Sequence, residues 1–136
     1  MRAVGIDLGE KRVGVAVSDS AGQIATPYEV LNRTGSREQD HSRIAAIVAE
    51  VEAEILIVGL PLSLDGSEGK AAREARGEAG LIESLLCIPV ELHDERFTTV
   101  EAERVLKEQN LDALARRKVI DKVAAAIMLQ AWLDGQ

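Results

Sequence analysis

The chain has 136 residues, a length that fits one domain with a hydrophobic core of its own. Apolar residues make up 46% and charged residues 29%, which is typical of a globular protein and excludes a disordered or fibrous one. The net charge of −7 argues against broad electrostatic binding of nucleic acid, although a local basic patch or acidic groups covered by cations would still permit it.

The single cysteine, Cys87, excludes an internal disulfide, and its apolar neighbours favour a small buried hydrophobe over a nucleophile. The sequence contains no signal peptide and no long apolar span. We therefore expect a cytoplasmic protein.

The first predicted strand alternates bulky and small side chains, with Val4, Ile6 and Leu8 on one face and Asp7 on the other. A carboxylate in such a strand must reach water at a cleft or be neutralised, because an unpaired buried charge is costly. Two interpretations follow: a metal ligand in the floor of a site, or a strand-end Asp bonded to turn amides through Gly9.

Two further strands follow. Residues 13–18 alternate in the same way after a short polar connection, which predicts a β-hairpin. Residues 23–31 form a third strand that Pro27 interrupts, as suits the edge of a sheet. These strands are predicted to form an antiparallel meander.

A helix is predicted after Ser36, which can cap it with Gln39 in the capping-box position. The apolar residues of this helix recur at helical spacing: Ile44, Ile47, Val48 and Val51. Residues 55–58 are continuously apolar, which predicts a strand buried on both faces. A loop over residues 59–67 leaves its carboxyl end, and the glycines in it favour mobility.

The C-terminal half alternates helices and strands. A second helix is expected from about residue 67 to 86, and a fifth strand over residues 89–92. Thr98 is predicted to cap a helix that runs through residues 105 and 106, and a last helix runs from near residue 118 or 121 to 133.

This order of elements predicts an α/β fold with a mixed five-stranded sheet, three strands antiparallel and two parallel, flanked by helices. The right-handed crossovers place the first strand near the centre. Sites in such sheets form at the carboxyl ends of the parallel strands. Asp7, the loop over residues 59–65, and Asp94 with Glu95 are therefore expected to converge on one cleft.

A third carboxylate comes from the last helix, where Asp121 precedes Ala124 and Ala125 at helical spacing on an apolar face. The alternative is a first-turn Asp that only the helix dipole favours. Asp7, Glu95 and Asp121 meeting at a cleft would raise each other's pKa unless divalent cations were present. This set suits two-metal phosphoryl transfer, in which oxygen ligands hold Mg²⁺ or Mn²⁺ ions roughly 4 Å apart.

Five segments together carry a resemblance to a known family: residues 5–9, residues 12–19, residues 58–62 with Asp65 and Gly66, residues 94–99, and residues 121–129. With them the chain resembles the YqgF/RuvX family of bacterial pre-16S rRNA nucleases and Holliday junction resolvase-like proteins. The resemblance implies a single ribonuclease H-like nuclease domain over residues 1–136. It also implies that Asp7, Glu95 and Asp121 are the catalytic, metal-binding acids, with Mg²⁺ or Mn²⁺ as cofactor.

Basic residues near these acids are the candidate substrate contacts. Arg12 could clamp a phosphate bidentately, and Arg96 either contacts a phosphate or pairs with a neighbouring acid. Arg116, Arg117 and Lys118 form the densest basic run and lead into the helix of Asp121, so they are the best candidate for a patch that guides a strand.

Other charged residues have simpler interpretations. Lys11 is expected to be a solvated turn residue. Lys70, Arg73 and Arg76 lie at helical spacing and favour an exposed helix face. His41 is expected to be structural or exposed and not a metal ligand.

Three hypotheses for function remain open. The first is an endonuclease of structured RNA, for which the resemblance implies 5′-end maturation of pre-16S rRNA in a ribosome precursor. The second keeps the chemistry and makes branched DNA the substrate. The third is a nucleic-acid-binding module without catalysis, such as a ribosome assembly factor; the oligomeric state is open in all three.

Overall fold

The computed structural model describes residues 1–96, 104, 107 and 113–136, and within the last range it leaves out the side chains of residues 113–119, 121 and 122. The helix predicted to begin at Thr98 lies outside the described residues. In the part that is described, no helix has the length and apolar character needed to cross a membrane.

The described strands form one mixed sheet of five in the order β3-β2-β1-β4-β5. Their bounds are β1 Ala3–Leu8, β2 Arg12–Ser18, β3 Ala25–Asn32, β4 Ile55–Leu60 and β5 Val90–Asp94. The pairs β1–β2 and β2–β3 are antiparallel, whereas β1–β4 and β4–β5 are parallel. The predicted sheet and the central position of its first strand are therefore confirmed.

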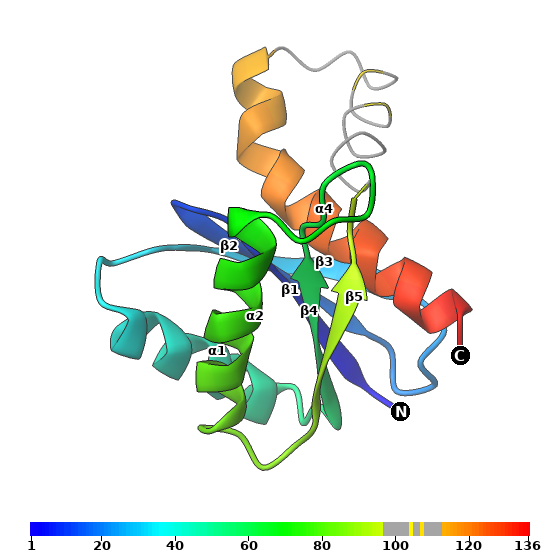
Figure 1. The fold of residues 1–136 in the computed structure, drawn as a ribbon. Helices are drawn as coiled ribbons and strands as arrows, with labels where there is room; N and C mark the ends of the chain where they lie inside the picture. Colours follow the sequence, from blue (N-terminus) through cyan, green and yellow to red (C-terminus); the bar gives the residue numbers. More distant parts are fainter. Residues whose placement is uncertain (97–103, 105–106, 108–112) are drawn as a thin grey trace.

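Two helices cover one face of the sheet and a third crosses the other (Figure 1). The first two are α1, Arg37–Glu50, and α2, Lys70–Glu83; the third is α4, Ala113–Asp134. The predicted cap of α1 is confirmed, because the Ser36 side chain accepts a hydrogen bond from the Gln39 amide. The second helix is shorter than predicted, since its cap is Gly69 and the preceding loop is closed by its own hydrogen bond, from the Ser63 amide to the Ser67 carbonyl.

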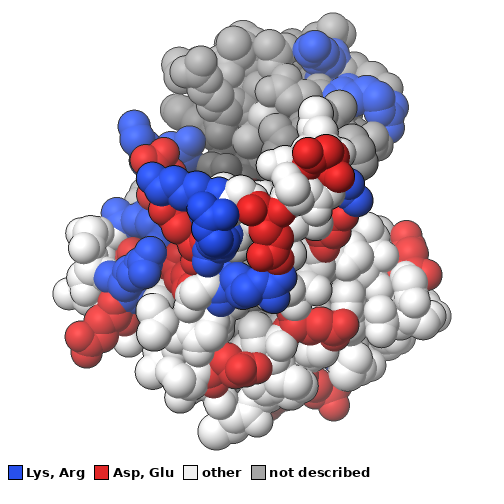
Figure 2. Space-filling model, viewed as in Figure 1, with Lys and Arg blue, Asp and Glu red and all other residues white. Residues whose placement is uncertain are grey.

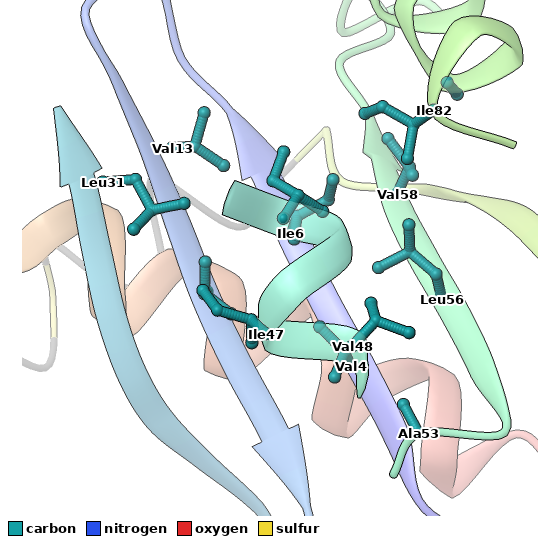
Figure 3. Close-up of a cluster of buried hydrophobic side chains, with 13 residues drawn as sticks. Val4, Ile6, Val13, Leu31, Ile47, Val48, Ala53, Leu56, Val58 and Ile82 are labelled. Carbon is teal, nitrogen blue, oxygen red and sulfur yellow. The ribbon is translucent and has the colours of Figure 1, made fainter. Parts of the chain in front are cut away.

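The alternation of each strand divides the core into two layers. On the α1–α2 side, Ile6 packs with Val13, Val58 and helix residues such as Ile82 (Figure 3). On the α4 side, the apolar residues packed together are Ala3, Ala16, Ile55, Ile57, Ala125, Met128, Leu129, Trp132 and Leu133. The prediction for Cys87 is wrong: it lies in the connection between α2 and β5 and is exposed, because that connection runs over the surface.

Candidate active site

Asp7 lies near the carboxyl end of the central strand β1, on the face that α4 covers. Its neighbours Ile6 and Leu8 point to the α1–α2 layer, so alternation directs Asp7 to the other side. Two residues earlier on the same face, a Cβ on Gly5 would lie 2.9 Å from the Leu129 Cβ, closer than real Cβ contacts come. Glycine therefore lets α4 pack directly against the strand that carries Asp7.

The turn after Asp7 is tight. The Gly9 amide donates to the Asp7 carbonyl at 3.1 Å, and a Cβ on Gly9 would lie 2.5 Å from the Arg12 carbonyl oxygen. Arg12 is half-buried at the start of β2, where its backbone is paired with Asn32. The hairpin thus fixes the backbone on both sides of the candidate substrate contact at Arg12.

Glu95 follows β5 directly and comes close to Asp7, although β4 separates the two strands. Its amide donates to the Leu60 carbonyl at 3.1 Å, which extends the parallel pairing beyond the last strand residue. A Cβ on Gly59 would overlap the Glu95 carboxylate. Glycine at this position of β4 therefore makes the space into which Glu95 turns.

The electrostatics of this pair are unfavourable for two charged carboxylates. Burial, the charge of Asp7 and a hydrogen bond with Asp7 together raise the pKa of Glu95 to about 9, with Asp94 adding to the shift. At neutral pH the metal-free pair therefore holds a proton between its oxygens. A divalent cation bound between the two carboxyl groups would displace that proton.

The third predicted acid, Asp121, is part of α4, and its side chain is outside the described residues. Along the helix it precedes the buried Ala124 and Ala125. The convergence of Asp121 with Asp7 and Glu95 stays a prediction. Arg116, Arg117 and Lys118 also lie on α4 with side chains outside the description, so their role as a substrate patch stays a prediction too.

Arg96 pairs with a neighbouring acid. Its Nε and Nη2 atoms both lie 2.9 Å from Asp94 Oδ2, and its Nη1 donates to the Leu64 carbonyl at 3.4 Å. The side chain therefore connects the end of β5 with the loop that leaves β4. Contact of Arg96 with a phosphate stays a prediction, and the pairing would orient the guanidinium for it.

A buried polar network, which sequence reasoning missed, supports the turn after Asp7 from the other side of the sheet. Arg33 donates from Nη1 and Nη2 to the two oxygens of Glu78 at 2.8 and 3.0 Å, and from Nε to the Gly9 carbonyl at 2.8 Å. His41 Nε2 lies 2.8 Å from Glu78 Oε2, so the expectation that His41 is structural is confirmed. Glu78 lies 45 residues from Arg33 and 37 from His41, so no local sequence pattern would have suggested the network.

Carboxylate oxygens close together at a strand end are the ligands that hard divalent cations prefer. Asp7 and Glu95 supply two such groups, and a bound cation would relieve the repulsion that helps to raise the pKa of Glu95. No third Asp, Glu, His or Cys completes a metal-binding group among the residues whose side chains are described. The donor set present fits a divalent metal that Asp7 and Glu95 would hold.

Solved structures show which class of fold this is. The chain is similar to a fowlpox virus Holliday junction resolvase, with a TM-score of 0.60 over 100% of both chains at 13% identity. It is also similar to Thermus thermophilus RuvC in complex with a Holliday junction, with a TM-score of 0.59 over 99% of this chain and 94% of that one at 17% identity. The fold is that of the ribonuclease H-like resolvases.

The family follows from the sequence. Residues 1–135 match the profile of the family described as "RuvX: Holliday junction resolvase". Proteins named "Putative pre-16S rRNA nuclease" from Pelotomaculum thermopropionicum and Anaeromyxobacter sp. strain Fw109-5 are 45% and 46% identical over 136 residues, covering all of this chain and 88% and 98% of theirs. The chain belongs to the RuvX family.

Proposed function

We propose that this protein is a metal-dependent endonuclease that processes the 5′ end of pre-16S rRNA in a cytoplasmic ribosome precursor, with residues 1–136 acting as one nuclease domain. The observation that carries the proposal is the carboxyl pair Asp7 and Glu95 at the carboxyl edge of the parallel strands, with the pKa of Glu95 raised to about 9. Relatives at 45–46% identity carry the name of a pre-16S rRNA nuclease, which supports this substrate.

In the proposed reaction the metal ion and the protein residues have different roles. When bound, Mg²⁺ or Mn²⁺ would supply Lewis-acid stabilisation of the attacked phosphate and an activated water. Asp7 and Glu95 would hold the metal ion. Because the site is partly buried, its dielectric would be low, and electrostatic stabilisation by the ion would be strong. Arg12 and Arg96, at the hairpin and beyond β5, would orient the phosphate.

Helix packing supports the inclusion of Asp121. Leu129 meets Gly5 on β1, and Gln130 bonds the Ala25 amide near the start of β3, so the C-terminal end of α4 lies toward the edge where β1 begins. At 1.5 Å per residue, Asp121 lies roughly 12 Å back along the helix from Leu129. That displacement leads toward the edge with Asp7 and Glu95.

The test is cleavage of a labelled precursor-rRNA mimic that carries a 5′ extension, with Mg²⁺ or Mn²⁺ and with EDTA. The expected result is metal-dependent cleavage by the native chain and none by Asp7→Asn, with unchanged circular dichroism. Full activity of Asp7→Asn would remove Asp7 from the mechanism. Tight metal-independent RNA binding without turnover would favour a binding module instead.

A second candidate substrate is branched DNA, because the matching family profile bears the description of a Holliday junction resolvase. A four-way DNA junction assayed beside the RNA mimic, under identical metal conditions, separates the two. Symmetric cutting of the junction with intact RNA would reverse the order of the candidates.

A further inference from the structure

A cleft of about 1000 Å³ opens at the same edge of the sheet, on the α1–α2 side. Its walls are the turn at residues 8–11, the start of α1, Pro61 after β4, and the N-terminal half of α2. We call it the α1–α2 cleft. Asp7 directly precedes the turn and faces the opposite side of the sheet, so the turn lies between Asp7 and the cleft.

Exposed cations border this cleft. Lys11, Arg37 and Lys70 line it from the hairpin, α1 and α2, and all three are exposed. Figure 2 shows Lys and Arg side chains, interspersed with Asp and Glu, over the upper end of α2 and the neighbouring part of this face. Among the described residues, no acid forms a salt bridge with Lys11 or Arg37, and Lys70 has only Glu74 at 3.8 Å.

Two of the four acids that line the cleft in the described part of the chain are buried and hydrogen-bonded within the protein. Glu78 is buried and bonded by Arg33 and His41, which lowers its pKa although burial opposes this. Asp40 is buried and accepts hydrogen bonds from the Thr34 amide and hydroxyl at 3.0 and 2.9 Å. The exposed rim therefore holds three cations against Glu10 and Glu74.

From this placement we infer that the α1–α2 cleft binds backbone phosphates of the nucleic-acid substrate, in a stretch that continues past the scissile position. The inference rests on the proposed nuclease function. A nucleic-acid strand whose reacting phosphate lies at Asp7 and Glu95 would cross the turn at residues 8–11 and then meet Lys11 and Arg37. Arg33 anchors this turn through the Gly9 carbonyl, so the crossing point is rigid.

The cleft recognises backbone and not bases. Among the described residues, its lining contains no aromatic side chain on which a base could stack, and its exposed charged groups are ammonium, guanidinium and carboxylate. Contacts of this kind position a strand and carry no sequence information. The contribution of the cleft to affinity is therefore independent of sequence and strongly dependent on salt.

The test compares Lys11→Gln/Arg37→Gln with native protein and with the control Arg43→Gln, which removes an exposed charge from α1 outside the cleft. Binding of a fluorescein-labelled RNA hairpin with a 5′ single-stranded extension is measured by anisotropy in EDTA across a salt series. We expect the double variant to bind roughly tenfold more weakly at low salt and the slope of log K against log salt to fall by about 2. Arg43→Gln should leave both unchanged, and thermal unfolding should be the same for all three proteins.

The outcomes separate this inference from the proposed function. Unchanged affinity and salt slope in the double variant, with native cleavage intact, would overturn the cleft and leave the nuclease standing. A loss of RNA binding in the double variant of a chain that cleaves nothing would support the cleft and overturn the nuclease. Equal losses in the double variant and in Arg43→Gln would show general charge attraction and overturn the cleft.

Discussion

Glu95 and Glu78 lie on opposite sides of the same edge of the sheet, and their surroundings shift their pKa values in opposite directions. Glu95 meets the carboxyl group of Asp7, and burial together with that contact raises its pKa to about 9. Glu78 is also buried, yet the hydrogen bonds from Arg33 and His41 outweigh burial and lower its pKa. Glu78 has a cationic partner within the fold, in Arg33, whereas Glu95 is placed beside a second acid.

The largest effect is expected from Glu95→Gln, which removes a candidate metal ligand and also the repulsion with Asp7. We expect cleavage to fall by roughly a thousandfold, or about 4 kcal/mol of transition-state stabilisation, while the metal-free protein becomes more stable at pH 8. Single-turnover cleavage and thermal unfolding in EDTA measure the two changes. A variant that loses both activity and stability would contradict the claim that contact between Glu95 and Asp7 destabilises the metal-free protein.

Next in size is Glu78→Gln, which keeps the shape of the side chain and leaves Arg33 without its charged partner. Breaking a largely buried ion pair in this way should cost about 2–4 kcal/mol of the free energy of unfolding. Urea unfolding measures it, with Glu74→Gln, an exposed acid on the same helix, as the control. Equal stability of Glu78→Gln and native protein would show that the network is not a structural anchor.

Gly59→Ala tests the space beside Glu95 without changing any charge. The added Cβ would overlap the Glu95 carboxylate, so the acid must move away from Asp7. We expect metal affinity and cleavage to fall roughly ten- to a hundredfold, as for other changes that reorient a metal ligand. Mn²⁺ titration measures the affinity, and unchanged binding would show that Glu95 is not a ligand.

The two acids also predict a pH dependence of the metal-free protein. Between its ordinary pKa of 4.5 and about 9, Glu95 holds a proton in the folded state that the unfolded chain releases, so stability should fall as pH rises through this range. Glu78 acts in the opposite sense: its contribution is present above 4.5 and is lost as pH falls through its lowered value. Thermal unfolding in EDTA from pH 5 to 9 should show the alkaline fall in native protein and not in Glu95→Gln.

The smallest effect is expected at the exposed ion pair of Arg76 with Glu68, which includes neither Glu95 nor Glu78. Glu68→Gln should change the free energy of unfolding by about 0.5 kcal/mol or less, because solvent screens such pairs. The same urea unfolding measures it. A change as large as that of Glu78→Gln would show that the buried and the surface ion pair stabilise the fold equally.

Much of this fold could be predicted from the sequence because local patterns determine it. The alternation in residues 3–8 and 13–18 assigned the faces of two strands, and the cap at Ser36 located a helix start. The proximity of Asp7 and Glu95 also followed, since the carboxyl ends of parallel strands share an edge. Helix ends were less accurate, as the earlier start of α4 at Ala113 shows.

The buried network could not be predicted in the same way. Arg33, His41 and Glu78 each lie in an ordinary amphipathic or polar segment, and their bonds span 37 to 45 residues. Only the packing of α1 and α2 on one face brings them together. The pairing of Arg96 with Asp94 was foreseen as an alternative because the two residues are close in sequence.

The contact between Gly5 and Leu129 links the hydrophobic interior to the placement of the candidate acids. Because the leucine occupies the place of a missing side chain, the helix and the strand interlock there, and neither slides without opening a void. A single methyl group added at Gly5 would shift the helix that carries Asp121 without changing any charge. If the proposed site is correct, aliphatic volume alone would then alter how its acids are placed.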